Sequence, residues 1–203
     1  MPGLFVTFEG IDRSGKTTQA RLLTEALGEG ALAVREPGGT ELGERLRELV
    51  KGAVSLGAVP EALLFAAARA QLVTDVIRPA LGRGLVVVCD RYVDSSLAYQ
   101  GAARGLGVEE VARVNEWATG GLVPDLKFLL ELDPAAAERR AGQADRFEDE
   151  GAGLQRRVAE AYAELADAEP ARWRRLDALR DPGEVHAEVL AAVEAARAGA
   201  VAP

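Results

Sequence analysis

The chain alternates short apolar runs with longer stretches in which apolar residues recur at helical spacing. A short unbroken apolar run is typical of a strand buried on both faces, whereas apolar residues three or four apart mark one face of a helix. The pattern predicts strands near 4–9, 31–35, 85–90, 126–132 and 172–177. Amphipathic stretches of about 10 to 25 residues separate them, which favours an α/β fold: a five-stranded parallel sheet with helices on both faces.

The clearest motif follows the first predicted strand. Residues Gly10 to Thr18 read Gly-Ile-Asp-Arg-Ser-Gly-Lys-Thr-Thr and fit G-x-x-x-x-G-K-[ST], between an apolar run and a helical pattern. Glycines let such a loop turn several backbone N–H groups toward one anion. Lys16 would reach the β- and γ-phosphates, and the Thr17 hydroxyl would coordinate magnesium. The motif predicts a nucleoside triphosphate site in a P-loop NTPase-type fold, rather than an ordinary glycine-rich turn.

Length and composition narrow the class of protein. The chain has 203 residues, enough for one domain spanning 1–203, to which we expect a small lid to belong at about 139–149. An apolar fraction of 48% excludes a disordered chain, and no apolar run is long enough to span a bilayer. A net charge of −8 argues against a nucleic-acid partner. The first strand begins almost at once, so we expect no export signal and a cytoplasmic protein.

Four rare residues add smaller constraints. Cys89 is the single cysteine and lies in an apolar run, which predicts a buried side chain and no disulfide. His186 has no cysteine or second histidine near it, so zinc chemistry is not expected. We expect Trp117 and Trp173 to be packing residues rather than walls of a ligand site.

Polar residues follow the second and third strands. In a parallel sheet, ligands bind at the carboxyl ends of the strands. Arg35 to Thr40 form a predicted Pro-Gly turn, and the helix after it carries Arg45 and Arg47. Asp90 closes the third strand and suits the second magnesium contact. Arg91 is placed to bind phosphate, although a structural ion pair is the alternative.

Two further stretches could contact a nucleotide. A predicted helix over 60–81 places Phe65 and Arg69 four residues apart on one face, where a ring could stack on a base and a guanidinium could donate to its edge. A core phenylalanine with a solvated arginine fits the spacing equally well. Residues 138–148 contain three arginines and small residues, which indicates a loop that closes over phosphates. A solvated charged turn is the alternative.

Four separate blocks resemble thymidylate kinases, which phosphorylate dTMP with ATP and magnesium. The second and third blocks together are specific to this family, whereas the first alone indicates only binding of a nucleoside triphosphate. The resemblance runs from Phe5 to about Glu164. The blocks are Phe8 to Thr18, Arg35 to Thr40, Asp90 to Tyr92 with Ser95 to Gly101, and Arg146 to Glu148.

The resemblance implies a role for each matched residue. The implied catalytic residues are Asp12, Arg13, Lys16 and Arg91, and the implied metal ligands are Thr17 and Asp90. The implied ATP contacts are Gly10, Ile11, Asp12, Arg13, Ser14, Gly15, Lys16, Thr17, Thr18 and Arg140. The implied dTMP contacts are Asp12, Glu36, Pro37, Arg47, Phe65, Arg69, Arg91, Ser96, Tyr99 and Gln100.

Within that set the resemblance implies particular contacts. Asp12 would hold the 3′-hydroxyl of the deoxyribose, and Tyr99 would crowd a 2′-hydroxyl. Arg47 and Arg91 would clamp the dTMP phosphate, and Phe65 would stack on thymine. The remaining implied base contacts are a donor to O4 from Arg69 and edge contacts from Ser96 and Gln100. Family members carry the extra catalytic cation either in the phosphate loop or in the lid; here Arg13 occupies the loop and 141–145 hold no basic residue.

The resulting hypothesis is transfer of the ATP γ-phosphoryl group to dTMP, giving dTDP and ADP, with Mg²⁺ as cofactor. A kinase for another nucleoside monophosphate or a nucleoside is the nearest alternative. A switch GTPase would need a guanine-reading Asn-Lys-x-Asp motif, which the sequence lacks. A non-catalytic binding module would need Lys16 or Asp90 to be missing. The resemblance also implies a homodimer through the apolar helices at 60–82 and 109–118.

Overall fold

A computed structural model describes residues 3–52, 55–140 and 152–199. Its five strands form one parallel sheet in the order β2-β3-β1-β4-β5, so the predicted fold class is confirmed. Each strand lies within one residue of its predicted bounds. The strands are β1 (Leu4–Glu9), β2 (Ala31–Arg35), β3 (Val86–Asp90), β4 (Leu126–Glu131) and β5 (Trp173–Asp177).

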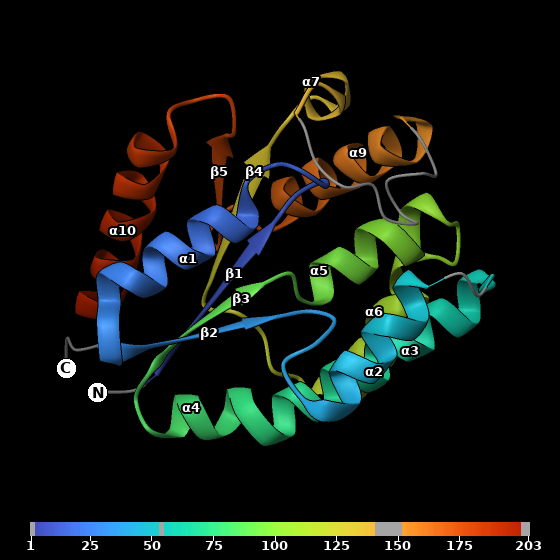
Figure 1. Cartoon of the computed structure of the whole chain (residues 1–203), viewed down its shortest axis with the longest axis horizontal. Helices are drawn as coiled ribbons and strands as arrows, with labels where there is room; N and C mark the ends of the chain where they lie inside the picture. Colours follow the sequence, from blue (N-terminus) through green and yellow to red (C-terminus); the bar gives the residue numbers. More distant parts are fainter. Residues whose placement is uncertain (1–2, 53–54, 141–151, 200–203) are drawn as a thin grey trace.

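Helices cover both faces of the sheet (Figure 1). Helices α1 and α10 lie together on one side, while α4, α3, α6 and α9 lie on the other. The helical elements are α1 (Lys16–Leu27), η1 (Gly28–Gly30), α2 (Glu41–Lys51), α3 (Ala58–Leu72), η2 (Val73–Ile77), α4 (Arg78–Gly82), α5 (Val93–Ser96), η3 (Leu97–Ala103), α6 (Val108–Thr119), α7 (Pro134–Glu138), α9 (Ala152–Ala168) and α10 (Pro182–Gly199).

The central strand explains why the apolar runs are unbroken. All six residues of β1 are buried, because successive side chains point to opposite faces and each face has a helical cover. Phe8 stacks on Phe128 of β4 with ring centroids 5.1 Å apart. Phe5, on the opposite face, meets the ring of Tyr92 edge-on at 4.9 Å. The sheet is therefore buried on both sides around β1.

The predicted helix over 60–81 is longer and less regular than expected. It begins at Ala58, with Pro60 in its first turn, and continues through α3, η2 and α4 to Gly82. The middle segment, η2, is π-helical, as is η3 further along the chain. Such segments resemble helices with one residue inserted per turn, and they recur near functional sites.

One packing expectation is wrong. Trp173 is buried, as predicted, but the side chain of Trp117 on α6 is 88% exposed. The spacing of apolar residues around Trp117 predicts an amphipathic helix. It does not predict whether other parts of the same chain cover the apolar face. None of the described helices is long and apolar enough to cross a bilayer.

The order of the strands positions the site. The chain passes from β1 to β2 and β3 on one side, then crosses to β4 and β5 on the other, so the topology reverses at β1. Loops diverge at such a point and leave a crevice beyond the carboxyl ends of the strands. The loop that carries the phosphate motif begins at this reversal.

Candidate functional site

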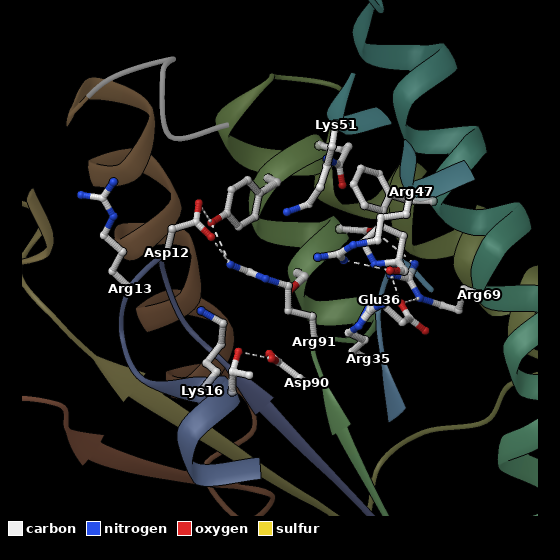
Figure 2. Close-up of a pocket in the computed structure, with 17 residues that line it drawn as sticks. Asp12, Arg13, Lys16, Arg35, Glu36, Arg47, Lys51, Arg69, Asp90 and Arg91 are labelled. Carbon is white, nitrogen blue, oxygen red and sulfur yellow. Dashed lines mark hydrogen bonds and ion pairs between the residues drawn. The ribbon is translucent and has the colours of Figure 1, made fainter. Parts of the chain in front are cut away.

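A pocket of about 420 Å³ opens beyond the carboxyl ends of β1, β2 and β3 (Figure 2). Most of the residues named from the sequence meet here, although they come from segments up to 88 positions apart (12 to 100). The lining residues are Asp12, Arg13, Lys16, Thr17, Arg35, Glu36, Pro37, Arg47, Lys51, Phe65, Arg69, Asp90, Arg91, Ser95, Ser96, Tyr99 and Gln100.

The lining is cationic although the chain is acidic. Seven of the lining residues are arginine or lysine and three are carboxylates, whereas the whole chain carries −8. Walls of one charge at a cleft attract a ligand of the opposite charge. The pocket therefore suits one or more anions, and its lining continues from the phosphate loop to Arg69.

Two glycines shape the phosphate loop. Gly10 has φ 138° and Gly15 has φ 97°, both in a range that side chains with a Cβ rarely adopt. A Cβ on Gly10 would also lie 2.6 Å from the carbonyl oxygen of Leu130. Gly15 stands directly before Lys16, the first residue of α1, so the loop closes at a helix N-terminus.

Lys16 is held inside the loop. Its ammonium group donates to the carbonyl oxygen of Ile11 at 2.5 Å and to the Ser14 hydroxyl at 3.2 Å. Burial lowers the pKa of Lys16 to about 8, with a further lowering from the nearby Arg91 charge. An anion in the loop would raise this pKa again and favour the charged ammonium group, so the position suits a phosphate.

Thr17 and Asp90 are the residues that could hold a divalent cation. The Thr17 hydroxyl donates to Oδ2 of Asp90 at 2.5 Å, so two oxygen ligands lie at one end of the pocket. Mg²⁺ prefers oxygen ligands and is usually bound by one or two protein groups together with substrate phosphates. No cluster of three or more metal-binding side chains is found in the described ranges. The pair therefore fits a magnesium ion shared with a nucleotide.

Arg91 is held in the pocket by contacts with several elements. It has φ 73°, in the left-handed region that residues other than glycine seldom occupy, which turns its side chain back over the phosphate loop. Its guanidinium pairs with Asp12 and donates to the Gly10 carbonyl at 3.2 Å. It also lies 5.2 Å from the centre of the Tyr99 ring. Arg91 is thus fixed in place without a bound anion.

The Asp12 carboxylate gathers three donors. Besides Arg91, it accepts from the Tyr99 hydroxyl at 3.2 Å and from Gln155 Nε2 at 2.9 Å. Burial raises the pKa of Asp12, but Arg91 and Lys16 lower it by more, so it stays below its ordinary value. Asp12 is therefore an ionised acceptor that lines the pocket next to Tyr99.

Arg13 and Arg140 form a reciprocal pair. Arg13 Nη1 donates to the carbonyl oxygen of Arg140 at 3.1 Å, and Arg140 Nη1 donates to the carbonyl oxygen of Arg13 at 2.9 Å. Arg140 Nη2 also donates to the Ala178 carbonyl at 2.5 Å. These bonds tie the phosphate loop to the end of α7 and to the loop after β5. Arg13 also has φ 62°.

The far end of the pocket is built around Arg69, which is only 1% exposed. Arg69 Nε donates to Oε2 of Glu36 at 2.7 Å, and Nη1 donates to the Ser96 hydroxyl at 3.1 Å. Its other contacts are the Asn115 amide oxygen and, at 3.0 Å, the Tyr92 carbonyl. Phe65 also lines this pocket. The Phe65 ring and the Arg69 guanidinium, which helical spacing predicted to lie on one face, therefore belong to the same cavity.

A buried carboxylate, Glu9, supports the turn that carries Arg91. Its Oε1 accepts from the backbone N–H of Tyr92 at 2.8 Å, and its Oε2 accepts from the hydroxyls of Ser95 at 2.6 Å and Tyr162 at 2.9 Å. Burial, followed by repulsion from Asp94, raises the pKa of Glu9 to about 7. Glu9 lies outside the pocket lining and acts on its shape.

Some predicted residues lie outside this pocket. Gly10 and Ile11 line a second cavity of about 220 Å³ on the other side of the loop. Ser14, Gly15, Thr18 and Arg140 are absent from both linings, although Ser14 and Arg140 contact the loop as described above. Arg146 to Glu148 and most of the predicted lid lie outside the described residues.

The structure adds residues that the sequence reasoning missed. Arg35 and Lys51 line the pocket, and Figure 2 shows the Lys51 amino group pointing into the space near Arg47 and Arg91. Lys51 lies four residues after Arg47, so helical spacing could have identified it. Gln155 carried no such signal, because it lies 143 residues from its partner Asp12.

The fold and this pocket are those of a P-loop nucleotide-binding protein with room for a second anionic ligand. Comparisons with known proteins agree and are more specific. The family described as "Thymidylate kinase" matches residues 8–189. The chain therefore belongs to the thymidylate kinase family.

Individual relatives cover nearly the whole chain. A "Thymidylate kinase" of Deinococcus radiodurans is 51% identical over 198 residues, which are 94% of this chain and 96% of the relative. One of Pelotomaculum thermopropionicum is 48% identical over 203 residues, 96% of this chain and 94% of the relative. The crystal structure of thymidylate kinase from Ehrlichia chaffeensis superposes with a TM-score of 0.82 at 32% identity, covering 96% of this chain and all of that one.

The raised pKa of Glu9 predicts a pH-dependent contribution to stability. The unfolded carboxyl loses its proton near its ordinary pKa of 4.5, whereas the folded one keeps it to about 7. Between these values the folded protein binds the extra proton, so the stability that Glu9 contributes falls as pH rises and then levels off. The free energy of unfolding of Glu9→Gln, measured relative to wild type, should therefore rise by up to about 3 kcal/mol between pH 5 and 8.

Urea unfolding of both proteins at pH 5, 6, 7 and 8 measures this difference. Glu25→Gln is a matched control, since Glu25 is exposed on α1 and pairs with Arg21 four residues away. Its difference from wild type should lack the rise between pH 5 and 8 expected for Glu9→Gln. A constant difference for Glu9→Gln as well would contradict the assigned titration.

Proposed function

We propose that this protein transfers the γ-phosphoryl group of ATP to dTMP, producing dTDP and ADP. The observation that carries the proposal is the continuous cationic lining, which runs from the phosphate loop past Arg91 to Arg47 and Arg69. One nucleotide would occupy the phosphate loop and the second would occupy the end near Phe65. Membership of the thymidylate kinase family supports the identity of the second nucleotide.

On the donor side, the loop residues Gly10 to Thr18 would bind the ATP phosphates, with Arg140 beside them. Lys16 would contact the β- and γ-phosphates, because its ammonium group is held at the centre of the loop. Thr17 and Asp90 would hold Mg²⁺, which when bound neutralises charge on the phosphate oxygens. With the phosphates held in this way, Arg91, which lines the same pocket, would be available to the γ-phosphoryl group.

On the acceptor side, Arg47 and Arg91 would bind the dTMP phosphate, together with the Glu36 to Pro37 turn. Arg47 donates to the Pro37 carbonyl at 2.9 Å, so a hydrogen bond joins this turn to the helix that follows it. Asp12 and Tyr99 would contact the sugar. The base would stack on Phe65, with Arg69, Ser96 and Gln100 along its edge.

The reaction requires the protein mainly to position the two substrates and to neutralise their charge. The acceptor oxygen of dTMP is already anionic at neutral pH, so no strong general base is needed. Two phosphate groups that repel each other must instead be brought into line. Lys16, Arg13 and Arg91 would lower that repulsion, most strongly as charge spreads over the transferring group.

A coupled assay with ATP and a panel of acceptors tests the proposal. We expect dTMP to be phosphorylated with the highest kcat/KM, ahead of dUMP, dCMP and dGMP. Analysis of products must show the diphosphate of the acceptor and not free phosphate. A preference for dCMP or dGMP would assign a different substrate, and acceptor-independent release of phosphate would indicate a hydrolase.

Loss of the loop arginine should slow the reaction severely. Arg13→Gly removes the guanidinium at a position whose positive φ glycine adopts freely, so the loop keeps its shape. We expect kcat to fall by about 10³ to 10⁵, the range for an arginine in this role in other phosphoryl-transfer proteins. Arg21→Ala on the exposed face of α1 is the control and should keep wild-type kcat. A fall of less than about threefold in Arg13→Gly would reject the role, given that range.

We also propose a cytoplasmic homodimer, joined through α3 and α6. Large apolar side chains on these helices are exposed in the single chain: Val59 by 55%, Leu63 by 53% and Trp117 by 88%. Exposure of this size on neighbouring helices favours a protein partner. The occupant is a second copy of this chain, as the family resemblance implies.

Trp117→Asp should convert the dimer into a monomer, because it places a charge in an apolar interface. Sedimentation equilibrium at several concentrations measures the change. Val123→Asp introduces the same charge at another exposed apolar residue, outside both helices, and should remain dimeric. A wild-type protein that sediments as a monomer at all concentrations would refute the dimer.

A further inference from the structure

A buried carboxylate stands behind the base end of the pocket. Glu61 lies in the first turn of α3 and has no exposed surface. Its Oε1 accepts from Gln100 Nε2 at 2.9 Å and from Arg104 Nε at 2.6 Å. Gln100 lines the pocket, but Glu61 does not. Glu61 therefore acts on the pocket through Gln100.

This contact sets the orientation of the Gln100 amide. A glutamine side chain has one donor end and one acceptor end, whereas a carboxylate paired with a guanidinium only accepts. The nitrogen end must therefore face Glu61, and the oxygen end must point away from it. Gln100 is 3% exposed, and its oxygen is not one of the fully buried side-chain atoms without a hydrogen-bond partner in the described residues. Because Gln100 lines the pocket and its nitrogen faces Glu61, the oxygen is the end that can face a ligand.

We propose that Glu61 is a positioning residue that determines the choice of pyrimidine. It holds the Gln100 carbonyl oxygen toward the base, where that oxygen accepts a hydrogen bond from N3–H. Thymine and uracil carry this donor, whereas cytosine carries a lone pair at N3. The inference rests on the proposed function and names the group behind its base specificity.

The fixed amide makes the discrimination strong. A free glutamine could turn over and donate its NH₂ group to N3 of cytosine. Here the same turn would bring the amide oxygen against the Glu61 carboxylate, so two acceptors would face each other in a buried site. A site whose polar groups are held in one arrangement rejects a mismatched ligand more strongly than an adaptable site.

Glu61→Leu tests the proposal with a side chain of similar size. Both Gln100 and Arg104 donate to Oε1 of Glu61, so an amide oxygen at this place would keep both bonds, whereas leucine has no polar atom. The Gln100 amide then loses the acceptor that holds its nitrogen end, and both of its orientations become available. We expect the ratio of kcat/KM for dTMP over dCMP to fall by about tenfold or more, the size of a buried polar mismatch. If Glu61 contributed to stability alone, the substitution would lower kcat/KM for dTMP and for dCMP together. A ratio within about twofold of wild type is far below the expected change and would overturn the proposal.

Arg104→Gln is the matched control. It removes the guanidinium that pairs with Glu61 but keeps the carboxylate that orients Gln100, so the ratio should stay at the wild-type value. A fall equal to that of Glu61→Leu would assign the effect to the ion pair and overturn the role of the amide.

Two further measurements keep the test decisive. If circular dichroism shows that Glu61→Leu is unfolded, Gln100→Met takes its place, because this apolar side chain of similar length has no donor and only a weak acceptor. The ratio for Gln100→Met should also fall, and a wild-type ratio would overturn the proposal. Wild-type protein that fails to phosphorylate dTMP would refute the proposed function, whereas activity with an unchanged ratio in Glu61→Leu refutes only this inference.

Discussion

Gathering positive charge in one pocket is the constraint on which this structure depends. Seven cationic side chains share the lining, and each would repel its neighbours if it had no counter-charge. Three of them are held by acceptors within the protein: Arg91 by Asp12, Arg69 by Glu36, and Lys16 by the Ile11 carbonyl. Because the protein supplies these partners in advance, little reorganisation remains when phosphates arrive.

The sheet provides the frame for those partners. Glu36 follows β2, Asp12 follows β1, and Asp90 ends β3, so three adjacent strands deliver carboxylates to the same edge. Parallel strands make this possible, since all their carboxyl ends meet at one side. The acidic groups and the arginines therefore assemble from separate parts of the chain without a long loop.

Much of this could be predicted because its signals are local. Apolar runs marked each strand, since a strand covered on both faces must be apolar throughout. The phosphate loop is a contiguous motif, and its glycines have the positive φ values that the motif requires. The Phe65 and Arg69 pair followed from spacing on one helix, although spacing could not reveal that Arg69 would be buried against four acceptors.

What escaped prediction depends on contacts between distant segments. Gln155 meets Asp12 across 143 residues, and Tyr162 meets Glu9 across 153. No periodicity or motif links such positions before the chain folds. The exposure of Trp117 could not be predicted either, because an amphipathic pattern shows that a helix face is apolar but not whether the same chain covers that face.

The π-helical winding of η3 has a consequence for how the pocket tolerates change in length. Its wide turn is closed by the bond from Arg104 N to the Tyr99 carbonyl at 2.9 Å. Removing one residue would restore the tighter, more favourable α-helical spiral, but it would also swing every later side chain by about 100° around the axis. Arg104 would then miss Glu61. A shorter helix with a more favourable local conformation would therefore lose the contact between Arg104 and Glu61 behind the base end of the pocket.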